Sequence, residues 1–179
     1  MKFADNKNLY IRRVLFVLLI VITATLQHTV GDTFSIFGAR AFLLIPLTVT
    51  IAMNEKSMGG LSFGVLAGVL WDAATVRGDG FYSVVLALAG FTAGVAVSYV
   101  VRNNILADML LTAGACLFVT TSYWLIFIFM RGYEGAFSML LSFYLPSAVY
   151  SFAFTAVYYY IVKNIINSSI CIIGKRFVI

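Results

Sequence analysis

Residues 59–80 read GGLSFGVLAGVLWDAATVRGDG, an apolar segment in which glycines recur every fourth position from Gly60 to Gly68 and Asp72 follows on the same spacing. Positions four apart lie on one face of an α-helix, so this face carries no side chain before the carboxylate. Small residues at this spacing let two membrane helices approach closely. A carboxylate on the same face needs a hydrogen-bond donor or a cation when lipid surrounds the helix. We therefore expect this segment to be an interface between packed membrane helices.

The composition of the whole chain is typical of an integral membrane protein. Of its 179 residues, 62% are hydrophobic and 11% are charged, and its mean hydropathy is +1.00. Apolar runs of about 17–25 residues, the length that crosses a bilayer, recur along the chain. The net charge of +5 does not indicate binding to nucleic acid, because the basic residues stand at the ends of apolar runs and form no patch with interleaved aromatic residues.

These runs predict an all-α fold, a polytopic bundle of six transmembrane helices. The predicted spans are residues 14–30, 35–53, 58–75, 81–101, 105–130 and 137–162. In the second span we expect Arg40 to reach the outer interface and Pro46 to introduce a kink or a tilt. The spans form one membrane domain over residues 14–163, preceded by residues 1–13 and followed by a tail over residues 164–179.

The basic residues predict the orientation of the spans. A cytoplasmic N-terminus places nine of them inside, namely Lys2, Lys7, Arg12, Arg13, Lys56, Arg102, Lys163, Lys175 and Arg176. It leaves Arg40, Arg77 and Arg131 outside. This asymmetry follows the positive-inside rule, and an even number of spans returns the C-terminus to the cytoplasm. The first apolar run also resembles a cleaved signal peptide, but an uncleaved anchor is favoured because the run is long and five spans follow.

Two smaller features concern the tail and the cysteines. Residues 164–179 either lie along the cytoplasmic lipid surface as an amphipathic segment or fray, since Gly174 and two serines weaken a helix there. Cys116 lies inside an apolar run and Cys171 lies in the tail, so we expect both to be free thiols.

Two roles are open for Asp72. The residue lies about one to two turns below the outer surface at a rise of about 1.5 Å per residue, where burying a charge costs less than at the bilayer centre. Asp72 either caps or pairs within the bundle, with Arg77 or Arg40 as the cation, or contacts a binding partner.

Further interface candidates surround this segment. Gly90 and Gly94 repeat the spacing in the fourth span and predict close packing against the third, while Gly78 and Gly80 allow the chain to reverse between the two spans. Arg131 stands in a turn that is either solvated or an anchor for an extracytoplasmic partner. The sixth span is rich in aromatic residues, which form an interfacial belt or line a groove.

Catalysis and transport have little support in the sequence. His28 is the single histidine and fits a hydrogen-bonded position near the outer end of a span. The chain shows no catalytic order of Ser, His and Asp, no cluster of Cys and His, and no pair of intramembrane carboxylates. A channel or proton pump usually needs more buried ionisable groups than Asp72. We therefore predict a non-enzymatic protein without a cofactor or metal.

Several motifs in order resemble the rod shape-determining protein MreD family. They are GARAFLLIP (38–46), GVLAGVLWD (64–72), RGDGFYS (77–83), LAGFTAG (88–94), RNN (102–104), RGYEG (131–135) and YLPSAVY (144–150). The likeness covers about residues 12–163 and depends on the ordered combination, since none of the motifs is catalytic. It marks as motif positions Gly64, Gly68, Asp72, Gly80, Gly90 and Gly94. Tyr144 and Pro146 are further interface candidates.

This resemblance implies a subunit of the bacterial elongation machinery in the cytoplasmic membrane. Such a subunit binds the single-span protein MreC. Through MreC or directly, it influences the peptidoglycan synthase pair of RodA and a class B penicillin-binding protein, coupled to MreB filaments, so that the cell keeps a rod shape. We expect the outer half of this chain, around Asp72, Arg77 and Arg131, to bind MreC.

The six-helix arrangement of this family is also similar to the substrate-binding S subunits of energy-coupling factor vitamin transporters, which leaves a second hypothesis. S subunits usually carry small residues four apart on the first span for docking to their transporter partner. Here Ala24 is followed at that spacing by His28. The short outer loops also offer few polar groups for a vitamin pocket.

Overall fold

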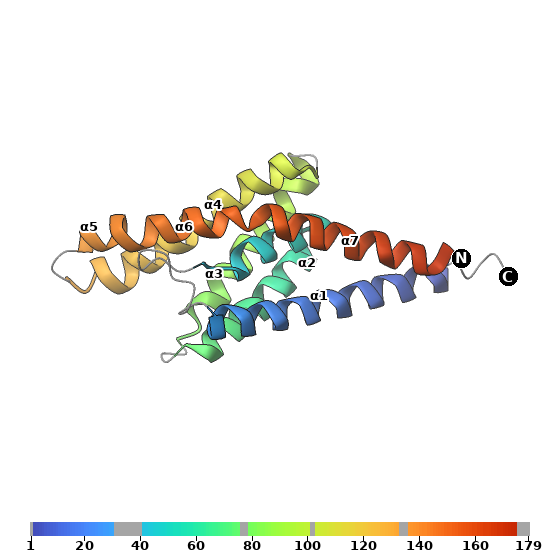
Figure 1. Ribbon diagram of the computed structural model, residues 1–179, viewed down its shortest axis with the longest axis horizontal. Coiled ribbons are helices and arrows are strands. Elements are labelled where there is room, and N and C mark those ends of the chain that lie inside the picture. Colours follow the sequence, from blue (N-terminus) through green and yellow to red (C-terminus); the bar gives the residue numbers. More distant parts are fainter. Residues whose placement is uncertain (1, 31–40, 76–78, 101–102, 133–135, 175–179) are drawn as a thin grey trace.

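The computed structural model describes residues 2–30, 41–75, 79–100, 103–132 and 136–174 (Figure 1). These ranges are helical and contain no strand, which confirms the predicted all-α class. The long helices are α1 (Lys2–Val30), α2 (Leu44–Ala74), α3 (Phe81–Tyr99) and α4 (Ile105–Trp124). The remaining elements are the π-helical segment η1 (Leu125–Phe129), α5 (Ala136–Met139), a second π-helical segment η2 (Leu140–Tyr144), α6 (Leu145–Ala153) and α7 (Thr155–Gly174).

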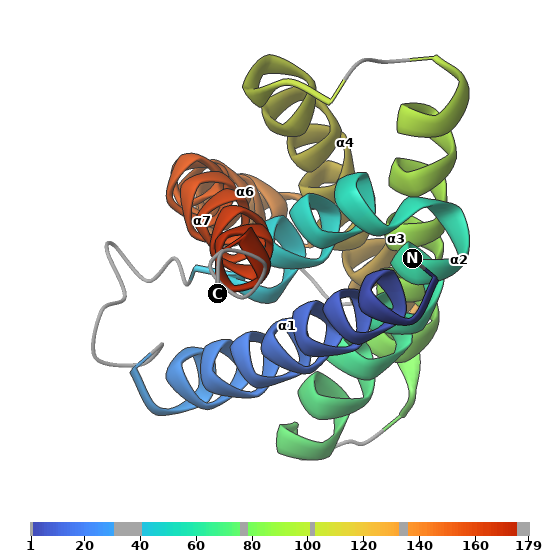
Figure 2. The ribbon, with the colours of Figure 1, turned by 90° about the vertical axis from the view of Figure 1, so that its right-hand side faces the viewer.

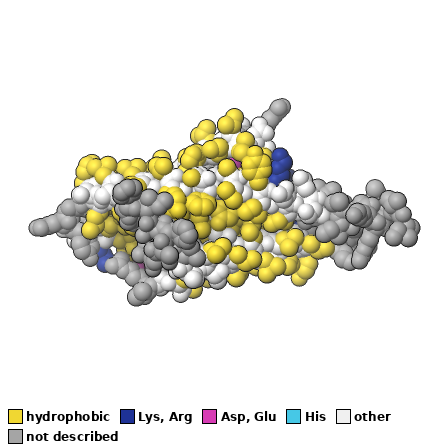
Figure 3. All heavy atoms as spheres, viewed as in Figure 1, with side chains coloured by type: hydrophobic (Ala, Val, Ile, Leu, Met, Phe, Trp, Pro, Cys, Tyr) yellow, Lys and Arg dark blue, Asp and Glu magenta, His cyan; other side chains and the backbone are white. Residues whose placement is uncertain are grey.

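Five helical stretches of the described chain are long and apolar enough to cross a membrane. They are Leu9–Thr29, Leu44–Ala74, Phe81–Tyr99, Ile105–Phe129 and Phe137–Ser168. Hydrophobic side chains cover much of the face in Figure 3, and some large ones are almost bare, such as Leu106 at 75% and Leu110 at 77% exposure. Apolar surface of this extent needs a cover other than water. The structure is therefore compatible with a multi-pass membrane protein.

Helix α2 is broken at Lys56, where φ is 64° and ψ is −172°. A Cβ placed on Gly60 would lie 2.7 Å from the Cβ of Ala52, although eight residues of one straight helix span about 12 Å. The chain therefore reverses here, in the interval between the predicted spans 35–53 and 58–75. The predicted kink at Pro46 is wrong. Pro46 lies in the first turn of α2, where a proline costs no helical hydrogen bond.

The segment before the break is the core of the bundle. Every residue from Leu44 to Met53 is buried, and this segment lies in the centre of Figure 2 with the other helices around it. A helix that is buried on all sides needs protein around it. Neighbouring helices also satisfy its first backbone groups: Leu44 N–H donates to Gln27 Oε1 of α1 at 3.0 Å, and Phe42 N–H donates to Ser151 Oγ of α6 at 2.8 Å.

A buried ion pair ties α1 to the break in α2. The Glu55 side chain is 2% exposed and pairs with Arg12 Nη2, while its Oε2 accepts from Arg13 Nε at 3.3 Å. The sequence predicted these arginines as orientation signals and missed the pairing. The start of α1 and the end of α7 lie at one end of the bundle (Figures 1 and 2), so the described chain begins and finishes on the same side.

Replacing Lys56 by glycine will raise the free energy of unfolding by about 1 kcal/mol. The Lys56 backbone lies in a region that almost only glycine adopts, at a cost of about 1–3 kcal/mol for other residues. The greater flexibility of glycine in the unfolded chain offsets about 0.5–1 kcal/mol of that gain. Unfolding of the purified protein in mixed detergent micelles measures the change. Lys56→Ala, which removes the charge and keeps the strain, is the control, and a gain equal to that of Lys56→Gly would exclude backbone strain as the cause.

Candidate functional site

Glycine faces join the second segment of α2 to α3. A Cβ on Gly64 would lie 2.4 Å from the Leu86 carbonyl oxygen, and one on Gly68 would lie 2.3 Å from the Ser83 Cα. A Cβ on Gly60 would lie 2.3 Å from the Gly90 carbonyl oxygen, and one on Gly94 would lie 2.6 Å from the Lys56 carbonyl carbon. Real Cβ atoms essentially never approach closer than 3.0 Å. The two backbones are therefore in contact, with no room for any side chain, as the glycine spacing predicts.

Asp72 stands at the end of this contact and caps α3. Its Oδ1 accepts from the Tyr82 N–H at 3.1 Å, and its Oδ2 accepts from the Ser83 N–H at 2.8 Å and from the Ser83 hydroxyl. These N–H groups belong to the first turn of α3, where the amides have no hydrogen-bond acceptor within their own helix. Negative charge is favourable at the N-terminus of a helix. The carboxylate, which is 7% exposed, is therefore stabilised by the amide groups at the start of α3.

The start of α3 depends on Gly80. Its φ is +72° and its ψ is 6°, the left-handed conformation, and a Cβ there would meet nothing within 4 Å. This glycine therefore serves backbone conformation and not packing. It turns the chain so that the Tyr82 and Ser83 amides face Asp72. The predicted cations Arg77 and Arg40 lie outside the described residues.

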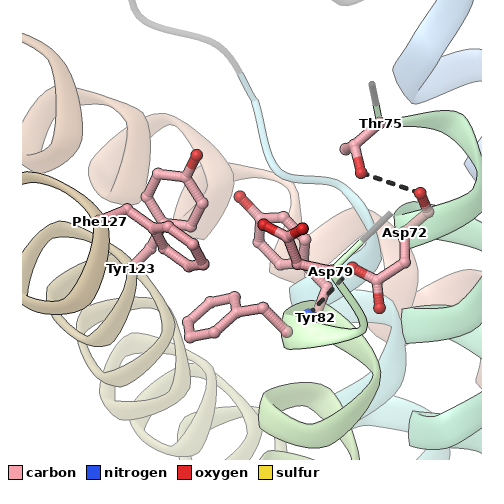
Figure 4. Close-up of a pocket in the computed structure, with 7 residues that line it drawn as sticks. Asp72, Thr75, Asp79, Tyr82, Tyr123 and Phe127 are labelled. Carbon is pink, nitrogen blue, oxygen red and sulfur yellow. Dashed lines mark hydrogen bonds between the residues drawn. The ribbon is translucent and has the colours of Figure 1, made fainter. Parts of the chain in front are cut away.

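A pocket of about 290 Å³ opens beside Asp72. It is lined by Asp72, Thr75, Asp79, Phe81, Tyr82, Tyr123 and Phe127. The end of α2 and the start of α3, which contribute to its lining, lie at the end of the bundle opposite the start of α1 (Figure 1). Figure 4 shows rings from α3, α4 and η1 on one side and Asp72 with Thr75 on the other. Aromatic walls with a few convergent polar groups are the usual chemistry of a recognition pocket.

The rings form a continuous row across α2, α3, α4 and η2. Trp71 stacks on Tyr82 with ring centroids 4.2 Å apart, Tyr82 stacks on Tyr123 at 5.6 Å, and Tyr123 lies 6.0 Å from Tyr144. Aromatic pairs at such distances contribute about 0.5–1.5 kcal/mol each beyond the area that they bury. This row holds one wall of the pocket in place and connects it to Asp72.

The structure brings two more of the predicted interface residues to this wall. The Arg131 guanidinium carbon lies 5.7 Å from the centre of the Phe127 ring, and Tyr144 ends the row of rings. Phe127 lies in η1, and Tyr144 is the last residue of η2. Single π-helical turns change the direction of side chains and are frequent at functional sites. Pro146 lies two residues after Tyr144, exposed in the first turn of α6.

Sequence reasoning missed most of the pocket. Asp79 and Tyr82 stood inside a quoted motif but received no role, while Tyr123 and Phe127 had no signal beyond their position near the end of a span. A second buried carboxylate also received no role. Asp108 in α4 is 0% exposed. Its place in the first turns of an apolar helix was the available signal.

The remaining candidates lie apart from the pocket. Cys116 is buried and free, as predicted, and the side chain of Cys171 lies outside the described residues. His28 is half-buried near the end of α1. Among the described residues, no three His, Cys, Asp or Glu side chains lie together as a metal cluster.

Comparison with known proteins adds no identification. No protein-family model matches this sequence, and neither a curated protein nor a solved structure is similar to it.

Proposed function

We propose that this chain is a non-enzymatic scaffold subunit of the bacterial elongation machinery, of the kind found in the MreD family. The observation that carries the proposal is that the motif positions behind the resemblance work together. Gly64, Gly68 and Gly90 build the α2–α3 contact, Gly80 orients the start of α3, and Asp72 caps it beside the pocket. A motif of this kind constructs a rigid recognition surface and performs no chemistry.

We further propose six crossings with both termini in the cytoplasm. The break at Lys56 divides α2 into two antiparallel segments, which turns five long apolar helices into six crossings. The first segment, over residues 44–55, is about 18 Å long and shorter than the bilayer core of about 30 Å. Because protein and not lipid surrounds this segment, its short length is tolerated within the membrane. The described ends of the chain on one side agree with an even number.

In this orientation the pocket faces the outside of the cell, where we propose that MreC binds. Asp79 and Arg131 are exposed there, and the row of rings between them offers the apolar and aromatic surface that dominates binding energy at interfaces. Effects on RodA, the class B penicillin-binding protein and MreB follow through MreC. The lipid bilayer contacts the exposed apolar faces.

Charge reversal at Asp79 will test MreC binding without disturbing the fold. Asp79→Lys changes an exposed carboxylate that lines the pocket, and we expect recovery of co-expressed MreC to fall at least about tenfold, equivalent to about 1.4 kcal/mol. Asn164→Lys, at an exposed position on α7, adds the same side chain away from the pocket. Equal recovery with both variants, each folded as judged by thermal melting, would remove MreC from this surface.

The pocket also favours a second function, that of a substrate-binding S subunit of a vitamin transporter. A volume of about 290 Å³ is near the lower end of small-molecule sites, about 300–1,000 Å³. Calorimetry of the purified chain with a panel of vitamins decides between the two. A substrate subunit binds one vitamin tightly without its partners, whereas the scaffold binds none and retains MreC.

A further inference from the structure

Asp108 is a buried carboxylate that the proposed function does not use. It is 0% exposed, and its Oδ2 accepts from the Thr50 hydroxyl at 2.9 Å, while its Oδ1 has no hydrogen-bond partner among the described residues. The described ion pairs involve Glu55 and not Asp108. Burying a carboxylate charge without a cation is costly in protein and in lipid.

A second unpaired oxygen lies one turn along the same helix. Thr112 is 0% exposed and its Oγ1 has no hydrogen bond among the described residues. Two other buried threonines, Thr48 and Thr120, donate instead to the carbonyl four residues earlier, at 2.7 Å and 2.6 Å. Residues four apart project from one helix face. Asp108 and Thr112 therefore present two unsatisfied oxygens side by side, and native structures rarely leave such atoms unpaired.

Three small ligands differ in how well they satisfy these atoms. A water molecule can bridge two oxygens but leaves the charge of Asp108 unbalanced. A proton on either oxygen of Asp108 removes the charge, but it leaves the Thr112 hydroxyl unpaired, because Asp108 Oδ1 and Thr112 Oγ1 make no hydrogen bond with each other. A cation between Asp108 Oδ1 and Thr112 Oγ1 balances the charge and satisfies both oxygens.

We propose that Asp108 and Thr112 of α4, with Thr50 of α2, bind one monovalent cation, and that this cation is sodium. One carboxylate balances one positive charge, whereas calcium sites usually gather several oxygen ligands with more negative charge. Carboxylate and hydroxyl oxygens are hard ligands that suit such an ion and not a soft metal. Asp108 lies one turn after Asn104, which is exposed at the start of α4. The ion joins the buried segment of α2 to α4.

Thermal melting of the purified full chain in sodium, potassium or choline chloride at equal ionic strength tests this site. We expect the melting temperature to rise with sodium concentration and to change little with choline, since a ligand that binds the native state stabilises it. Asp108→Asn and Thr112→Val should abolish the sodium-dependent rise. Thr92→Val, which removes an exposed hydroxyl of α3 outside the proposed site, should keep it. Saturable binding of radioactive sodium to the unmodified chain, one ion per chain, is the direct measurement.

Other results would overturn the proposal. A melting temperature that depends on pH and is the same in all three salts would make the ligand a proton. A melting temperature that depends neither on pH nor on the salt would indicate that a bridging water occupies the site. If Asp108→Asn fails to fold, the radioactive sodium assay on the unmodified chain still decides, and absence of saturable binding there excludes the site.

Discussion

Gly68→Ala will lower the free energy of unfolding by about 3 kcal/mol, the upper part of the range for overpacking. The added methyl group would lie 2.3 Å from the Ser83 Cα and 2.5 Å from the Tyr82 carbonyl oxygen. Both are backbone atoms, so no side chain can move aside, and α2 and α3 must separate. Unfolding in mixed detergent micelles, followed by circular dichroism, measures the loss.

Gly114→Ala is the matched control for this change. Gly114 lies within α4, and a Cβ there would meet nothing within 4 Å. The same substitution should therefore leave stability unchanged or raise it by up to about 1 kcal/mol, because alanine favours a helix more than glycine does. Equal losses at the two positions would show that the α2–α3 contact is looser than the structure has it.

Asp72→Ala will cost about 2–3 kcal/mol of stability, because the Tyr82 and Ser83 amides and the Ser83 hydroxyl lose their acceptor together. Buried donors without a partner cost about 1–3 kcal/mol each, and access of water or a shift of the first turn of α3 reduces the sum. Asp72→Asn retains one acceptor oxygen and should show a smaller loss. Micelle unfolding of the two variants gives the order.

Asp79→Ala provides the comparison for Asp72. This carboxylate is seven residues along the chain and lines the same pocket, but it is exposed, so its removal should change stability by less than about 0.5 kcal/mol. If Asp79→Ala were as damaging as Asp72→Ala, capping of α3 would not be the reason for the effect. Together with the MreC assay of Asp79→Lys, this comparison distinguishes Asp72, which stabilises the surface, from Asp79, which we propose contacts MreC.

The limits of two helices and the start of a third could be predicted from sequence with good accuracy. The predicted spans 81–101 and 105–130 end within two residues of Phe81–Tyr99 and Ile105–Phe129. The last span, predicted over 137–162, continues to Ser168. Apolar length sets these limits because a helix in lipid satisfies its backbone hydrogen bonds internally. The glycine spacing was sufficient to predict the contact between α2 and α3, since positions four apart share a face in any helix.

The break in α2 and the ionic contacts could not be predicted in this way. Pro46 looked like the site of distortion, but the distortion falls at Lys56, because the first turn of α2 tolerates proline and the reversal needs a positive φ. Arg12 and Arg13 of α1 read as orientation signals, although both pair with the buried Glu55 of α2. The spacing of residues around Asp108 does not show whether this carboxylate is buried in the core or lies at the membrane interface.

The sequence by itself determined the all-α class, the apolar helices and the glycine face that lets α2 and α3 touch, because each follows from the order of residues within one helix. Tertiary structure decided which donors reach Asp72, that rings from α2, α3 and α4 meet in one row, and that Asp108 and Thr112 lie in the core. These outcomes depend on which helices become neighbours. That choice is made by packing among many side chains at once, and no local pattern records it.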